Sequence, residues 1–349
     1  MRKGSSSLLV LASAIPLVSS AAPILNSDKY LEGVFSTALI LTDSEMLSFG
    51  FANFDPNEIF GTDNPNFGGQ EAVDARKKIR GTSLPISFLF ENDENNWLHR
   101  LKLRAAYMEL SRDINYQALD ELNLDWESDK TTDQVWSGYA EYALGYQVSE
   151  GWQFFVGSGL HLMHYRNRFT ANSPLKGLIE ENNIDSVING SSNIWIAEPQ
   201  ADLIYTKDMG PGEIKFNTEY HYFWGRSYGG SIDTSSATPE GWRFMNSLQY
   251  KYHLKPWGDR KQDFLVRFRR IDVGGDLRDP VGATHYNEYA FGWVVDTSDY
   301  SSVIYNVGIG ININYGSSLK GAHWCSFTMN NKKAQLIELG FFVCDGIAD

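Results

Sequence analysis

The residues best suited to acid–base chemistry are two histidines, His161 and His221. In extended segments, alternate residues share a face, and this spacing would bring the histidines to the same side as several carboxylates. A histidine beside a carboxylate can relay a proton or assist hydrolysis. The alternative is a network of paired polar groups filling a water-lined interior, which we favour. The carboxylates concerned are Glu141, Glu198, Asp202 and Glu219.

No complete set of catalytic or metal-binding residues surrounds these histidines. Ser158 and His161 are three residues apart, so their side chains would point to opposite faces of a strand. His161 and His164 are separated in the same way. His323 and Cys325 fall in a predicted loop and have no identifiable third partner. We therefore predict no catalytic residues, no metal, no cofactor and no enzymatic activity.

Basic residues form a second regular pattern, because Arg100, Lys102 and Arg104 alternate along one segment and share a face. A positive wall of this kind could favour anions or hold an acidic plug. We favour the alternative, in which these residues balance acidic groups such as Glu288 across the same interior. The other basic residues assigned to this interior are Arg243, Lys251, Arg267 and Arg269.

These candidates lie in long segments with alternating apolar and polar residues. Between Ser302 and Tyr315, one face carries seven large apolar residues, whereas positions 306–314 of the other face carry only Asn and Gly. Strands of soluble proteins average about 5–6 residues, and a tilted membrane strand needs about 9–11. Charged residues on lipid would each cost about 2–4 kcal/mol near mid-bilayer, so the charged face must be the inner one.

The pattern predicts an all-β fold, an antiparallel transmembrane β-barrel of about 12 strands. Short connections alternate with longer ones such as 112–133 and 167–193, as expected for a membrane barrel. The segment from Val34 to Leu41 also has strand character; it could continue the first strand, or enter the barrel as a plug or short helix. The predicted strands are 45–54, 81–91, 97–111, 134–148, 151–166, 194–206, 212–226, 241–254, 261–273, 286–297, 302–315 and 334–344.

The N-terminus has the features of an export signal. Arg2 and Lys3 precede a short apolar run, and the small residues before Ala22 suit a signal peptidase. The run is too short to cross about 30 Å of hydrocarbon as a helix. We therefore predict a signal peptide at 1–21, an N-terminal lead at 22–44 and the barrel at 45–349.

Composition narrows the choice of partner. A net charge of −13 argues against nucleic acid, because binding phosphates requires a basic surface. Aromatic residues make up 14% of the chain, as expected if they form girdles at the two membrane interfaces. The predicted strand positions separate Cys325 from Cys344, so we expect no disulfide between them.

The organisation from about Asp28 to Val343 resembles the translocator domain of autotransporters, specifically the solitary kind without a large passenger. The final segment, Gln335–Val343, is similar to the C-terminal β-signal that the barrel-insertion machinery reads, although six residues follow it. The resemblance implies a bacterial outer-membrane location, contact with lipid and with that machinery, and a structural or translocation-pore role. A monomer is favoured. The alternatives are a channel for small solutes, a barrel enzyme and a soluble secreted β-protein.

Overall fold

The computed structural model describes residues 27–41, 78–91, 95–114, 127, 129–173, 189–232, 237–258, 260–278, 284–296, 306–316, 320–329 and 336–339. These residues form the helix α3 (Ser27–Leu41) and the strands β1 (Lys78–Glu91), β2 (Trp97–Ile114), β3 (Asp129–Ser149), β4 (Trp152–Thr170), β5 (Ser191–Asp208), β6 (Gly212–Gly230), β7 (Glu240–Trp257), β8 (Arg260–Gly275), β9 (His285–Asp296), β10 (Asn306–Gly316), β11 (Lys320–Met329) and β12 (Leu336–Leu339). In this part of the chain, no helix has the length and apolar character to cross a membrane.

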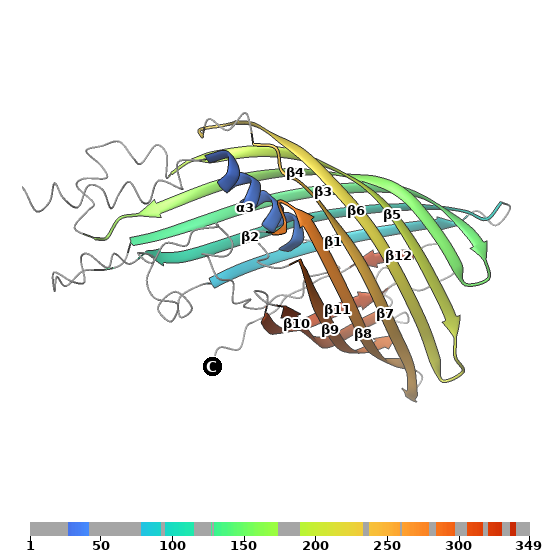
Figure 1. Ribbon diagram of the computed structural model, residues 1–349. Helices are drawn as coiled ribbons and strands as arrows, with labels where there is room; N and C mark the ends of the chain where they lie inside the picture. The colour runs from blue at the N-terminus through green and yellow to red at the C-terminus, as the bar shows by residue number, and fades with distance from the viewer. Residues whose placement is uncertain are drawn as a thin grey trace, which may run out of the picture.

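The strands form one antiparallel sheet that curls around an interior (Figure 1). Strands β1 to β11 each pair with their neighbours in sequence, and β12 pairs with β1. Pairing of the first and last strands is how an up-and-down sheet becomes a barrel. Within the described residues, β11 and β12 form no ladder with each other, although some of their Cα atoms lie within 8 Å. The predicted all-β antiparallel fold is confirmed.

One strand that the structure describes is missing from the predicted set, and several predicted strands end up to five residues short of the observed bounds. The loop predicted around His323 and Cys325 is wrong, because these residues lie in β11, which pairs with β10 along its length. The apolar alternation in this segment is weak, so its pairing with the strongly patterned β10 determines its structure. The predicted strand at 45–54, the predicted signal peptide, the end of the predicted β-signal and Cys344 lie outside the described residues. The total of twelve strands therefore does not test the predicted count.

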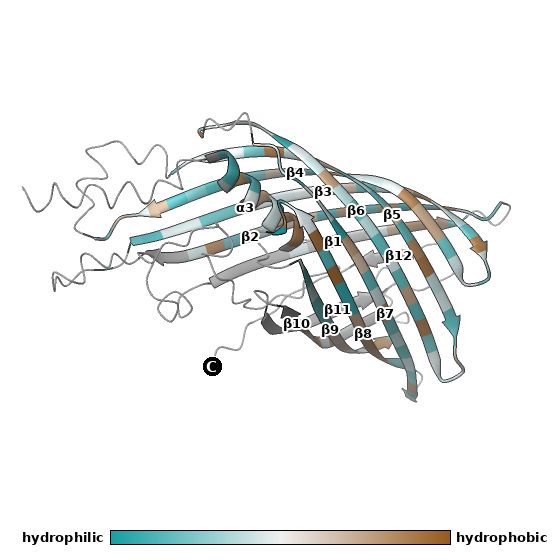
Figure 2. Ribbon diagram, viewed as in Figure 1, coloured by the Kyte–Doolittle hydropathy of each residue, from teal (hydrophilic) through white to brown (hydrophobic). Residues whose placement is uncertain are grey.

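Burial alternates along the strands as the sequence pattern requires, and Figure 2 shows the corresponding bands of hydrophilic and hydrophobic residues. In β3, the side chains of Val135 and Glu141 are buried, whereas the outward-facing Trp136 and Tyr142 are 41% and 52% exposed. Large apolar side chains on the outside of a barrel suit hydrocarbon. The outer face is therefore the lipid-facing surface.

Aromatic pairs mark two levels on this outer face. Trp97 packs on Tyr146 near the short turns, with ring centroids 5.2 Å apart. Tyr107 packs on Trp136 towards the long loops, at 5.4 Å, and each lies seven residues from the loop end of its strand. Positions 97 and 107 are ten residues apart, which is about 33 Å along a strand. At a tilt of about 40° this becomes about 25 Å, the height of the apolar band of a membrane barrel.

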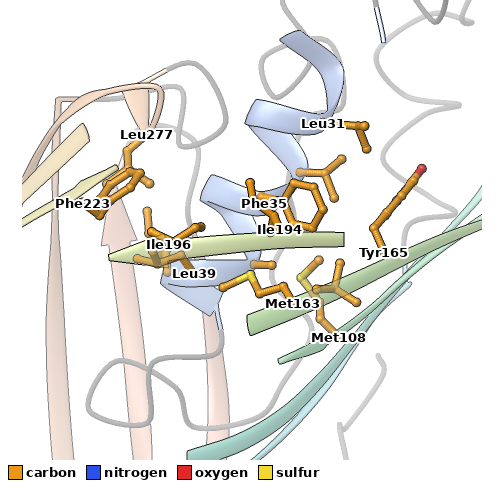
Figure 3. Close-up of a cluster of buried hydrophobic side chains, with 14 of the residues drawn as sticks. Leu31, Phe35, Leu39, Met108, Met163, Tyr165, Ile194, Ile196, Phe223 and Leu277 are labelled. Atoms are coloured by element: carbon orange, nitrogen blue, oxygen red, sulfur yellow. The ribbon is translucent and has the colours of Figure 1, made fainter. Parts of the chain in front are cut away.

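Helix α3 lies on the concave side of the sheet, near the ends of the strands that lead into the long loops (Figures 1 and 3). The segment 34–41, for which strand and helix both remained open, is helical. Leu31, Phe35 and Leu39 follow at intervals of four, so they form one apolar face, and each is at most 1% exposed. That face packs against inward-facing residues of the strands: Met108, Met163, Tyr165, Ile194, Ile196 and Phe223.

Candidate functional site

A charged layer lies next to the apolar layer beneath α3. Strand β5 shows the change most clearly, because alternate residues along its inner face are buried from Ser192 to Asp202. Ile194 and Ile196 belong to the cluster around α3. Further along the same face, Glu198, Gln200 and Asp202 are also buried, with exposed fractions of 0%, 5% and 1%. The inner face therefore passes from apolar to polar within one strand.

Glu198 is the centre of the first half of this layer. Its Oε1 accepts hydrogen bonds from Arg243, at 2.7 Å, and lies 3.0 Å from His221 Nδ1. Its Oε2 lies 2.6 Å from His161 Nε2. All four side chains are buried and come from the four consecutive strands β4 to β7. A buried carboxylate with this many partners is fully compensated.

Arg100 is the centre of the second half. It binds Glu141 through Nε, at 3.0 Å, and it also pairs with Asp202. Lys102 Nζ lies 3.8 Å from Glu141 Oε2, which also accepts a hydrogen bond of 2.9 Å from the Tyr139 hydroxyl. Because Arg100 joins β3 to β5 across the interior, it ties together strands that are not neighbours in the sheet.

His221 connects the two halves. Its Nδ1 faces Glu198, whereas its Nε2 lies 3.4 Å from Glu219 Oε2 and 4.0 Å from Asp202 Oδ1. Asp202 and Glu219 are direct partners in the β5–β6 ladder, so two carboxylates lie side by side on the inner face. His221 therefore presents one ring nitrogen to each group of acids.

Apart from His161 and His221, the formal charges of this layer balance among the described residues. Arg104 completes the basic set; its guanidinium lies over the Tyr139 ring, 4.6 Å from the ring centroid. The same ring packs on His161, with centroids 4.2 Å apart. The four basic side chains are Arg100, Lys102, Arg104 and Arg243, and the four acidic ones are Glu141, Glu198, Asp202 and Glu219.

The other three predicted interior residues lie on β7 and β8. Arg267 pairs with Glu288 at 2.6 Å, between β8 and β9. Lys251 pairs with Glu213 at 3.2 Å, near the short-turn ends of β6 and β7. Arg269 is buried on β8, two residues from Arg267. The structure thus brings ten of the predicted interior residues into one layer and places these three on the inner faces of β7 and β8.

One grouping was not predicted. Asp202, Glu219 and His221 each offer a ligand atom, and these atoms lie within 4.8 Å of one another. The prediction of no metal-binding cluster considered only the spacing of possible ligands within one segment at a time. This group combines β5 and β6, and only the ladder between them shows that Asp202 meets Glu219 and that Gln200 meets His221.

The chain was compared with curated proteins and with solved structures. No curated protein matches the chain. The chain is similar to the β domain of the Bordetella autotransporter BrkA, at 9% identity over 75% of this chain and 99% of that one, with a TM-score of 0.36. The translocator domain of NalP from Neisseria meningitidis matches at 8% identity over 78% and 91%, with a TM-score of 0.35. The porin NanC matches at 13% identity over 74% and 100%, with a TM-score of 0.32.

The sequence itself supplies the assignment. Residues 32–327 match the family described as the solitary outer membrane autotransporter beta-barrel domain. The match begins within α3 and ends within β11, so it includes the charged layer and nearly all of the sheet. A barrel of this kind is located in the bacterial outer membrane, where its outer face meets lipid. The chain belongs to the solitary outer membrane autotransporter β-barrel family.

Proposed function

We propose that this protein is a barrel without a large passenger, closed by its own helix α3, with a structural or translocation-pore role. The observation that carries the proposal is the burial of α3 on the concave side of the sheet. Six of its apolar residues are at most 4% exposed: Leu31, Val34, Phe35, Ala38, Leu39 and Ile40. A helix buried to this extent fills the space that an open channel would leave for water.

The charged layer supports a closed interior in a second way. Beneath α3, Arg100 and Arg243 reach across the interior to carboxylates on other strands. A solute passing through would have to break these ion pairs, and separating buried charges is costly. The balance of charges also argues against an anion-selective wall, which needs an excess of basic groups. These features favour a closed barrel over a channel for small solutes.

We also propose that the barrel is not an enzyme. His161 and His221 both lie against Glu198, and the Tyr139 ring covers His161. Both imidazoles are at most 4% exposed, so a substrate would not reach them in this arrangement. Loss of the His161 or His221 side chain should then change stability without removing a catalytic activity towards lipid or peptide.

For partners, we propose insertion by the barrel-assembly machinery and function as a monomer. The support for insertion is that the last strand, β12, pairs with β1, where a closing strand must lie. The proposal of a monomer is tested by the mass of the protein–detergent complex. A defined dimer at low detergent concentration would contradict it.

Conductance across planar bilayers tests the closed barrel. The full chain should show little steady conductance. Phe35→Asp places a charge in the apolar cluster and should cause frequent openings, because an unpaired buried charge is strongly unfavourable. Phe35→Leu changes the same side chain but keeps it apolar, and serves as the matched control. Steady conductance by the unmodified protein would support the small-solute channel instead.

A further inference from the structure

We propose that Asp202, Glu219 and His221, together with Gln200, form a binding site for one divalent transition-metal ion, with Zn²⁺ as the ion that best fits these ligands. The site lies in the charged layer of the interior. The inference is independent of whether the barrel is open or closed.

The four residues form a compact square on the inner face of the sheet. Asp202 is opposite Glu219 in the β5–β6 ladder, and Gln200 is opposite His221. Residues two apart on one strand share a face, so all four side chains project into the same small region. All four are buried, and none is more than 5% exposed.

The spacing of the ligand atoms suits a small cation. His221 Nε2 and Glu219 Oε2 are 3.4 Å apart, which is about the edge of a tetrahedron with bonds of about 2.1 Å to zinc. Asp202 Oδ1 is 4.0 Å from the same nitrogen, so a shift of a few tenths of an ångström would complete three ligands. One imidazole nitrogen with carboxylate oxygens is a set that Zn²⁺ accepts.

Two of these side chains also lack the partners that buried polar groups normally have. Gln200 is 5% exposed, and neither its amide oxygen nor its amide nitrogen has a hydrogen-bond partner among the described residues. Asp202 Oδ1 is buried without a hydrogen-bond partner in the same set of residues. Unsatisfied buried groups are rare in folded proteins, and a bound ion or an ordered water is a common reason for them. A cation between Gln200 and Asp202 would satisfy both oxygens.

The surroundings support the ligands in the manner of metal centres. A metal-binding histidine usually donates its other ring N–H to a carboxylate, and Glu198 Oε1 lies 3.0 Å from His221 Nδ1. Arg243 Nη2 is 3.3 Å from that nitrogen because it donates to the same Glu198 oxygen. The two acidic ligands are hydrogen-bonded in turn, Asp202 by Arg100 and Glu219 by Asn217.

The competing explanation for this arrangement is that His221 is doubly protonated and no metal is bound. If His221 carries protons on both nitrogens, its Nε2–H faces the two carboxylates and no metal is required. Zinc can bind only the neutral imidazole, so binding would release that proton. A direct binding measurement therefore decides between the two.

The experiment is calorimetric titration of the detergent-solubilised full chain with ZnCl₂, after stripping with a chelator. We expect one ion per chain. His221→Gln should weaken binding by at least about tenfold, because it removes the nitrogen ligand. His164→Gln is the matched control, because His164 is an exposed histidine on the outer face of β4. Each variant must first show the heat-modifiable gel migration of a folded barrel.

Gln200→Leu provides a second variant that leaves every ion pair of the layer in place. It should weaken zinc binding several-fold and alter the visible spectrum of bound Co²⁺, which reports the ligand set. Equal zinc binding by all variants would show adventitious binding and overturn the proposal. Absence of binding by the folded, unmodified protein would also overturn it and assign the site to a doubly protonated His221.

Discussion

Asp202 and Glu219 lie directly opposite each other on the inner face of the β5–β6 ladder, and both are buried. Like charges at directly opposed positions destabilise a sheet. In this barrel, Arg100 binds Asp202 and His221 lies beside both carboxylates. The pair therefore depends on groups contributed by other positions, and its stability is a property of the whole charged layer.

Removing Arg100 should be strongly destabilising. Arg100→Leu leaves Asp202 and Glu141 buried without the cation that they share, and breaking a buried pair in this way costs about 3–5 kcal/mol. Denaturant unfolding of the detergent-solubilised barrel measures the change in free energy. Arg270→Leu is the control, because Arg270 is exposed and pairs only locally with Asp272. Equal stability of the two variants would show that the interior pairs contribute little.

A charge on the outer face should be costly in proportion to its depth in the bilayer. Leu160 is 46% exposed and lies near the middle of β4, between the aromatic levels. Leu160→Arg should therefore lower the unfolding free energy in lipid bilayers by about 2–4 kcal/mol. Val148→Arg, at an exposed position near the short turns, should cost only about 0–1 kcal/mol. Equal costs at both positions would contradict the placement of the bilayer.

Strands with strong alternation could be predicted from the sequence because period-two patterning is a local signal. β10 is an example, since the alternate apolar residues from Val307 to Ile313 are typical of a strand and not of a helix. β11 lacks this signal and is defined by its partner, so it was missed. In α3, Val34, Ala38 and Ile40 fit a strand as well as a helix, and burial against the sheet decides the outcome.

The candidate site was also predictable only in part, because the sequence pattern is local and the contacts between strands are not. That His161, Glu198 and Arg243 should share an interior follows from their alternation along each strand. Which of them meet depends on the stagger between strands, and alternation within one strand does not encode the stagger. The opposition of Asp202 and Glu219 is a consequence of the β5–β6 register, so the grouping with His221 emerged only from the fold.

The closure by α3 should depend on pH through Glu32. Burial raises the pKa of Glu32 above its ordinary value, whereas the hydrogen bond of 2.8 Å from the Thr238 backbone N–H to its Oε1 lowers it. Because the net shift is upward, the docked helix favours the protonated acid. Docking is therefore at full strength below the ordinary pKa of a glutamate and weakens as pH rises through the raised value.

Openings in planar bilayers should accordingly become more frequent as pH rises from acid towards neutral. Glu32→Gln mimics the protonated acid and keeps an oxygen for the Thr238 N–H, so its openings should remain rare across this range. Asp276 and Asp28 also raise the pKa of Glu32, whereas Lys29 lowers it, and Asp276→Asn measures the contribution of Asp276. A pH profile that is the same in Glu32→Gln as in the unmodified protein would show that another group controls the helix.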